Sequence, residues 1–165
     1  MLRVAGVEPS SIVDGPGFRY TIFLQGCSHH CKGCHNPATW DFSGGMEMEI
    51  SNIAADIDKA YYIDGVTISG GEPLDQADRL IELLNVLKQK GLHIILFSGY
   101  TFEEAVIDKD KRACLEKTDI LIDGEFIEGK KSLDLRFRGS TNQRVIDVPS
   151  SLKEGKPILI DWDII

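Results

Sequence analysis

No run of apolar residues approaches the length of roughly 20 that a membrane-spanning helix requires, and the first residues lack a basic segment followed by an apolar one. We therefore expect neither a membrane protein nor a secreted one. Basic residues are also in the minority, because 18 Lys and Arg stand against 26 Asp and Glu, for a net charge of −8. This balance argues against direct nucleic-acid binding, which favours a basic surface.

Cysteines are few, four in 165 residues, and three of them, Cys27, Cys31 and Cys34, lie within eight residues. Clustered cysteines in an intracellular chain indicate a metal or redox site rather than a disulfide scaffold. The spacing Cys-x3-Cys-x2-Cys places three soft thiolate ligands on one loop, which favours a four-iron cluster with one iron left open. Two alternatives stay open: a structural zinc site, with Cys114 or a nearby histidine as fourth ligand, and ordinary reduced cysteines.

Short β-branched runs alternate with segments of helical periodicity, which predicts βαβ units and a mostly parallel sheet. The predicted strands are Tyr20–Leu24, Val66–Ile68, Ile94–Phe97, Ile120–Ile122 and a last short one at Ile158–Ile160. The predicted helices are Glu49–Tyr61 and Gln76–Lys90. Asp75 and Gly91 are expected to cap the two ends of the second helix, and Thr101–Glu104 resembles a capping box. Arg136–Val148 is expected to be extended chain and turns.

Chain length selects among the βα folds. A complete eightfold βα barrel needs about 250 residues, so there is room here for roughly half of one. We predict an α/β fold, a small incomplete βα barrel with a mostly parallel sheet, formed by a single domain over residues 1–165; a small doubly wound sheet is the alternative. In both folds functional groups gather at the carboxyl ends of the strands. Those ends carry the cysteines, Gly70–Glu72, Ser98–Tyr100 and Asp123–Gly124, which we expect to converge on one face.

Longer motifs surround the cysteines. Cys-x3-Cys-x2-Cys after a strand near the N-terminus resembles the signature of the radical S-adenosylmethionine superfamily. Further motifs are similar to those of the activases of glycyl-radical enzymes, namely Asp14–Arg19, Ile22–Cys27, Gly33–Pro37, Thr39–Trp40, Thr67–Leu74 and Ser98–Glu104. The small size and the stretch Arg138–Arg144 are similar in particular to the activating components of anaerobic (class III) ribonucleotide reductases.

This resemblance implies cofactors and residues that contact them. The three clustered cysteines would hold a [4Fe–4S] cluster, whose open iron would bind S-adenosylmethionine and cleave it reductively. The implied S-adenosylmethionine contacts are Gly33, His35, Gly70, Gly71, Glu72 and Ser98. Gly33 occupies a position where many members of the superfamily carry an aromatic residue beside the adenine, so the adenine contact must come from elsewhere, with His35 as one candidate. Without the cysteines, Gly70–Glu72 also fits a plain strand-to-helix turn, and Ser98 a turn that starts a helix.

The resemblance also implies protein partners in an anaerobic cytoplasm. These are the large subunit of an anaerobic ribonucleotide reductase, which would lose a hydrogen atom from a glycine Cα, and a flavodoxin or ferredoxin as electron donor. The segment 130–144 carries five basic residues and one acidic residue. We predict that Arg136, Arg138 and Arg144 dock a partner by electrostatic steering, a solvated basic loop being the alternative. An activase of another glycyl-radical enzyme and a non-catalytic zinc or electron-transfer module remain alternative functions.

Overall fold

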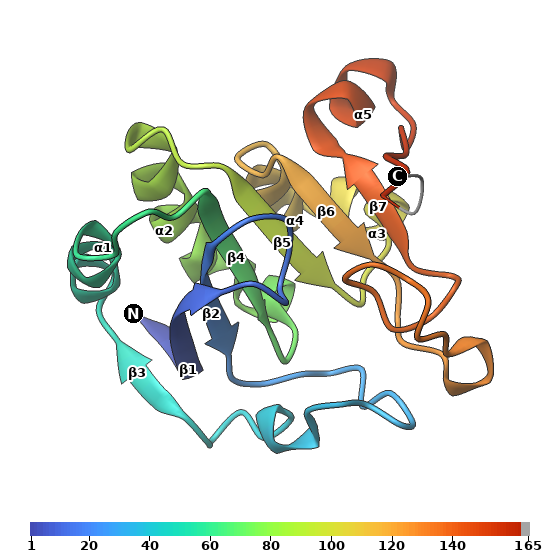
Figure 1. Cartoon of the computed structure of the whole chain (residues 1–165), viewed down its shortest axis with the longest axis horizontal. Helices are drawn as coiled ribbons and strands as arrows, with labels where there is room; N and C mark the ends of the chain where they lie inside the picture. The colour runs from blue at the N-terminus through green and yellow to red at the C-terminus, as the bar shows by residue number, and fades with distance from the viewer. Residues whose placement is uncertain (163–165) are drawn as a thin grey trace.

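The computed structural model describes residues 1–162, and its centre is one seven-stranded sheet with the strand order β3-β1-β2-β4-β5-β6-β7 (Figure 1). The strands are β1 Leu2–Ser11, β2 Arg19–Leu24, β3 Met46–Met48, β4 Gly65–Gly70, β5 Ile94–Ser98, β6 Ile120–Asp123 and β7 Arg144–Asp147. The four central strands β2, β4, β5 and β6 run parallel, as predicted. At the edges β1, β3 and β7 pair antiparallel to their neighbours.

Helices connect the parallel strands. They are α1 Ile50–Asp58, α2 Ala77–Gln89, α3 Phe102–Val106 and α4 Lys109–Leu115, and α5 Val148–Glu154 follows β7. The parallel strands follow one another in sequence order without a reversal. Because crossovers between parallel strands are right-handed, an order without reversal puts their helices on the same face of the sheet. The result is the arc of an incomplete βα barrel, as predicted, and not a doubly wound sheet.

The main hydrophobic core lies between the sheet and these helices. Leu80, Leu83, Leu84 and Leu87 of α2 are fully buried there, which confirms the helical periodicity of the sequence. Gly91 follows the end of α2, as predicted: its φ of +74° is left-handed and its N–H donates to the carbonyl of Lys88. The capping box at Thr101 is confirmed as well. Within residues 1–162 no helix is long and apolar enough to cross a membrane.

Three predictions about elements were wrong or incomplete. Asp75 does not cap α2, because it lies in a preceding 3-10 turn and its carboxylate accepts hydrogen bonds from Ser28 N and Tyr100 Oη. Ile158–Ile160 forms no strand and contributes one isolated bridge, from Leu159 to Ile146. The sequence pattern also did not indicate β1, β3 and β7 as antiparallel edge strands.

The loop between β1 and β2 crosses the face of the sheet opposite the helices (Figure 1). Gly15 in this loop packs so closely that an added Cβ would lie 2.8 Å from side-chain atoms of Arg19 and Ile95. Arg19 donates from Nε to Thr67 Oγ1 over 2.7 Å, and Thr67 Oγ1 in turn donates to the carbonyl of Asp14. The loop is thereby fastened over the amino-terminal half of this face, and the half at the carboxyl ends of the strands is left for a cavity.

Candidate functional site

A cavity of about 620 Å³ lies at the carboxyl ends of the parallel strands. Its wall takes residues from each of the four predicted groups, namely the cysteine loop, the turn after β4, the end of β5 and the segment after β6. The convergence of these groups on one face is therefore confirmed. It follows from parallel strands, whose carboxyl ends meet at the same edge of the sheet.

The three clustered cysteines all line this cavity. Burial raises the pKa of the Cys27 thiol, and burial followed by the Glu125 carboxylate raises that of Cys31, while a backbone hydrogen bond from Phe126 acts in the opposite direction. Asn36 N donates to Cys34 Sγ over 3.4 Å. Cys114 lies apart in α4, buried in the core, and its thiol donates to the carbonyl of Ala77. Cys114 is thus a small buried core residue that does not line the cavity.

The glycine turn Gly70–Gly71 forms part of the same wall. Gly70 has a φ of +106°, and an added Cβ would collide with the backbone of Leu24, while one on Gly71 would collide with the backbone of Gly26. Glu72 N donates to the carbonyl of Gly26 over 2.8 Å. Glycine is thus required because the turn lies directly against the segment that leads into the cysteines.

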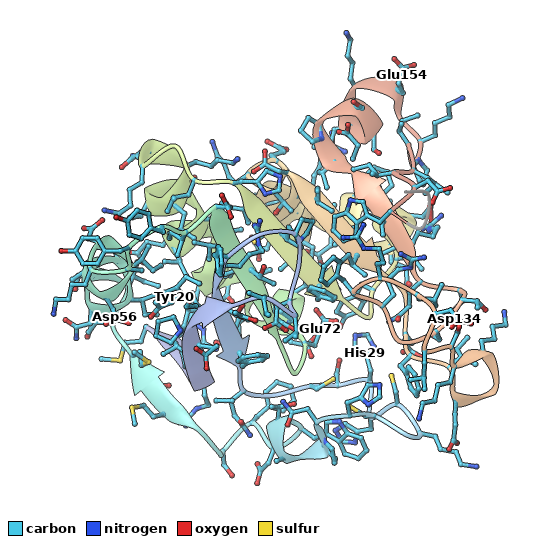
Figure 2. All side chains as sticks on the ribbon, in the orientation of Figure 1. Tyr20, His29, Asp56, Glu72, Asp134 and Glu154 are labelled. Atoms are coloured by element: carbon cyan, nitrogen blue, oxygen red, sulfur yellow. The ribbon has the colours of Figure 1, made fainter. Side chains whose placement is uncertain are left out.

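Glu72 is fully buried and lies near His29 (Figure 2). Oε2 accepts from Leu74 N over 2.8 Å, Oε1 accepts from Gly99 N over 2.6 Å, and Ser98 Oγ lies within 3.0 Å of both oxygens. Burying a carboxylate is costly unless it is hydrogen-bonded, and this one has donors on both oxygens. In this arrangement Glu72 joins the turn after β4 to the end of β5. Glu72 itself does not line the cavity, whereas Gly70, Gly71 and Ser98 do.

His29 completes this network. Its side chain is only 9% exposed, with Nε2 2.8 Å from Glu72 Oε1 and Nδ1 2.8 Å from Glu125 Oε1. The hydrogen bond to Glu72 outweighs burial and, together with Glu125, raises the pKa of His29 to about 9. The imidazolium therefore links the cysteine loop to the turn after β4 and to the segment after β6. No local sequence pattern indicated this position, because its partners Glu72 and Glu125 lie far away along the chain.

The remaining predicted residues are three expected S-adenosylmethionine contacts and three expected partner-docking arginines. Gly33, His35 and Ser98 are near the cysteines: His35 and Ser98 line the cavity, and Gly33 packs against the Phe126 ring of the cavity wall. Arg138 also lines the cavity, and exposed Arg136 donates to the carbonyl of Trp162.

Arg144 binds two acidic residues of the protein itself. It contacts the buried carboxylate of Asp123 and donates from Nη2 to both oxygens of Glu103, and the bond to Asp123 raises its pKa further above the usual range. Its charge is therefore matched inside the protein, which weakens its case as a residue that docks a partner.

The donor set can be compared with what an iron–sulfur cluster needs. Three thiols face one cavity, and thiolates are the ligands of such clusters. Within residues 1–162 no three His, Cys, Asp or Glu side chains are arranged around a point that a single metal ion would occupy. A four-iron cluster separates its thiolate ligands more widely than a single ion does, so three cysteines spread around a roomy cavity fit the cluster.

Comparisons with known proteins agree with this donor set. A family model described as "4Fe-4S single cluster domain" matches residues 13–146, which include the cysteines, the glycine turn and Glu72. Fold and site thus define an iron–sulfur protein of the single-cluster class. The fold also resembles the crystal structure of QueE from Escherichia coli, with a TM-score of 0.50 and 16% identity over 74% of this chain and 69% of that one.

Proteins of similar sequence identify the family within this class. The anaerobic ribonucleoside-triphosphate reductase-activating protein of Vibrio cholerae is 38% identical, over 82% of this chain and 91% of that protein. The one of Haemophilus influenzae is 37% identical with the same coverage. The chain belongs to the family of the anaerobic ribonucleoside-triphosphate reductase-activating proteins. The pyruvate formate-lyase-activating enzyme of Listeria monocytogenes is also 37% identical, over 92% of this chain but only 64% of that enzyme.

Proposed function

We propose that this protein uses a [4Fe–4S] cluster and S-adenosylmethionine to generate a glycyl radical on an anaerobic ribonucleoside-triphosphate reductase. The observation that carries the proposal is the placement of three cysteine thiols and the Gly70–Gly71 turn on the wall of one cavity. The relatives named above support the choice of partner, because the chain covers 91% of two reductase-activating proteins but only 64% of the lyase-activating enzyme. Residues 1–165 would form one domain of this kind, working in an anaerobic cytoplasm.

When bound, the cluster would pass one electron from an external donor to S-adenosylmethionine, which would yield methionine and, after hydrogen abstraction from a glycine Cα, 5′-deoxyadenosine. The protein's own residues bind and orient. Cys27, Cys31 and Cys34 would ligate three irons, and the backbone carbonyls of the glycine turn would accept hydrogen bonds from the ammonium of the methionyl group. Gly33, His35 and Ser98 would supply further contacts to S-adenosylmethionine.

Glu72 and His29 would act as positioning residues in this mechanism. Their contact joins the turn after β4 to the cysteine loop, and Glu125 extends the link to the segment after β6. His29, Glu72 and Glu125 would therefore hold three segments of the site in one arrangement. The same contacts occupy the Glu72 carboxylate, so the ammonium would be recognised by backbone atoms of Gly70 and Gly71.

The first experiment is formation of 5′-deoxyadenosine. The protein is reconstituted anaerobically with iron and sulfide, reduced with dithionite and mixed with S-adenosylmethionine, with and without the reductase. We expect iron and sulfide of about four each per chain and product above the level of a Cys34→Ala control, while Cys114→Ala retains both. A colourless protein with zinc and no iron, or full activity of the Cys34→Ala variant, would overturn the proposal.

Partner docking calls for a separate measurement. Arg136 and Arg138 lie on the segment that borders the cavity, and a flavodoxin or ferredoxin donor is acidic enough to be attracted there. We expect the double charge reversal Arg136→Glu and Arg138→Glu to slow radical formation with the physiological donor or the reductase, more strongly at low salt. Cleavage driven by dithionite should be unchanged. An unchanged rate with both partners would exclude docking at this segment.

A further inference from the structure

One aromatic ring of the cavity wall, that of Phe126, is held between two glycines. Phe126 follows β6 and lies partly buried beside the cysteine loop. An added Cβ on Gly33 would lie 3.3 Å from its Cε1, and one on Gly139 would lie 2.9 Å from its Cδ2. The ring therefore fills a slot that exists because both neighbours lack side chains.

Phe126 is also close to the cysteine ligands themselves. It lines the same cavity as Cys31 and Cys34, and its ring packs at 5.2 Å from the ring of His35, tilted by 56°. Gly33 and His35 are the two residues that flank Cys34. A ring from a segment about ninety positions further along the chain thus stands where the cysteine loop itself offers only a glycine.

Four other phenylalanine or tryptophan rings line the cavity, those of Phe23, Trp40, Phe97 and Phe137. Phe23 and Phe97 belong to strands β2 and β5, and Phe97 packs against the smaller core cluster of Ile95, Ile122 and Val145. Trp40 is stacked on His30, with ring centroids 4.7 Å apart and planes within 5°. Phe137 packs edge-on against Trp162 at 5.5 Å. Of these five rings, Phe126 is the one that an added Cβ on Gly33 of the cysteine loop would contact.

S-adenosylmethionine has two chemically distinct ends. Its methionyl end is charged and would bind backbone carbonyls and the open iron of the cluster. Adenine, in contrast, is a flat ring that gains affinity by stacking on an aromatic side chain. We propose that Phe126 is the residue that contacts this adenine. The inference rests on the proposed function, and it assigns to the segment after β6 a contact that Gly33 cannot make.

The test separates the two ends of the ligand. Binding of S-adenosylmethionine, 5′-methylthioadenosine and methionine is measured anaerobically by calorimetry on the reconstituted protein. We expect Phe126→Ala to weaken the two adenosine-containing ligands about tenfold and to leave methionine unchanged, while Phe126→Tyr restores binding. Gly139→Ala keeps the ring but displaces it, so it should show the same pattern. Phe18→Ala, at a half-exposed phenylalanine at the opposite end of the sheet, is the matched control.

Three outcomes would overturn the inference. Unchanged binding of S-adenosylmethionine in Phe126→Ala would show that the ring does not contact adenine. An equal loss for methionine would show that the substitution disturbs the cysteine loop in general, and iron content measured on each variant identifies that case independently. Wild-type protein that carries its cluster but binds none of the three ligands would overturn the proposed function, and the inference with it.

Discussion

Two charged side chains are buried at opposite ends of the central sheet, and their surroundings differ in kind. Arg19 begins β2, is 2% exposed, and donates to Thr67 Oγ1 and to the carbonyls of Val66 and His93. Burial lowers its pKa to about 10, although Asp64 and Asp119 act against this. Glu72 follows β4 and accepts from side chains and amides of three separate segments, including the ring of His29.

The difference lies in what each charge connects. The partners of Arg19 are the sheet itself and the adjoining loop, so the guanidinium serves the scaffold. The partners of Glu72 include the loop that carries the cysteines and the end of β5, so the carboxylate holds together parts of a site. A buried charge can therefore be judged by the segments it joins, because its degree of burial is the same in both cases.

The largest effect on folding is expected from Arg19→Met. Removing the guanidinium leaves several buried acceptors without a donor, which should lower the free energy of unfolding by about 3 kcal/mol. Urea denaturation of the apoprotein measures this, and Arg79→Met at an exposed position of α2 is the matched control. Iron content per folded chain should stay at the wild-type level. A loss of iron as large as the loss of stability would contradict the assignment of Arg19 to the scaffold.

Glu72→Gln is expected to destabilise less and to damage the site more. Hydrogen bonds to a charged group are replaced by bonds to a neutral one, which should lower the free energy of unfolding by about 2 kcal/mol. In addition, the new amide N–H would face hydrogen-bond donors that the carboxylate accepted from. We expect weaker cluster retention and strongly reduced 5′-deoxyadenosine formation, measured as iron content and product yield. Glu82→Gln on the exposed side of α2 serves as control. Wild-type product yield would remove Glu72 from the site.

Gly91→Ala tests a position where only backbone conformation matters. Its φ is +74°, and an added Cβ would meet no atom within 4 Å. The left-handed conformation should cost about 1 kcal/mol, seen as a lower thermal midpoint, with cluster content and product yield unchanged. A change in either site measurement would show that the helix end at α2 is coupled to the cavity.

The smallest expected effect is a pH dependence at the amino-terminal end of the sheet. Burial, and then Arg19, lower the pKa of His93 below its ordinary 6.5. Between the two pKa values the folded protein therefore binds fewer protons at His93 than the unfolded chain does. As a result, His93 does not destabilise the protein above about pH 6.5 and lowers its stability as the pH drops below that value. His93→Asn should reduce this fall, as measured by urea denaturation at about pH 7.5 and about pH 5.5. An equal fall in both proteins would contradict it.

Much of the fold could be predicted because local patterns and global packing agree. The leucines of α2 mark one buried face of a helix, and the β-branched runs of β2, β4, β5 and β6 mark strands that are buried almost throughout. The edge strands were not predicted because their patterns of buried and exposed residues are weak. β3 has three residues, and in β1 only Leu2, Val4 and Ser11 are buried. Such strands form because a neighbour offers free hydrogen-bonding groups, and a residue pattern does not record that.

In the site, too, local sequence motifs could be predicted, whereas contacts between distant segments could not. The cysteine spacing and the glycine turn are local, and both come together in one cavity. The position of His29 is set by Glu72, 43 residues away, and by Glu125, 96 residues away, so its residue type gave no indication of burial. The place of Phe126 likewise depends on Gly33 and Gly139, which belong to different segments of the chain.

The isolation of Cys114 has a practical consequence for anyone handling the protein. Its thiol is fully buried, and burial raises its pKa to about 12, so it is protonated and unreactive while the chain is folded. The other three cysteines open onto the cavity. Alkylation of the folded protein therefore reports on the cavity alone: the thiols that react are those left unoccupied, and labelling of the fourth signals unfolding. Mass spectrometry of the alkylated chain thus measures loading and integrity in a single sample.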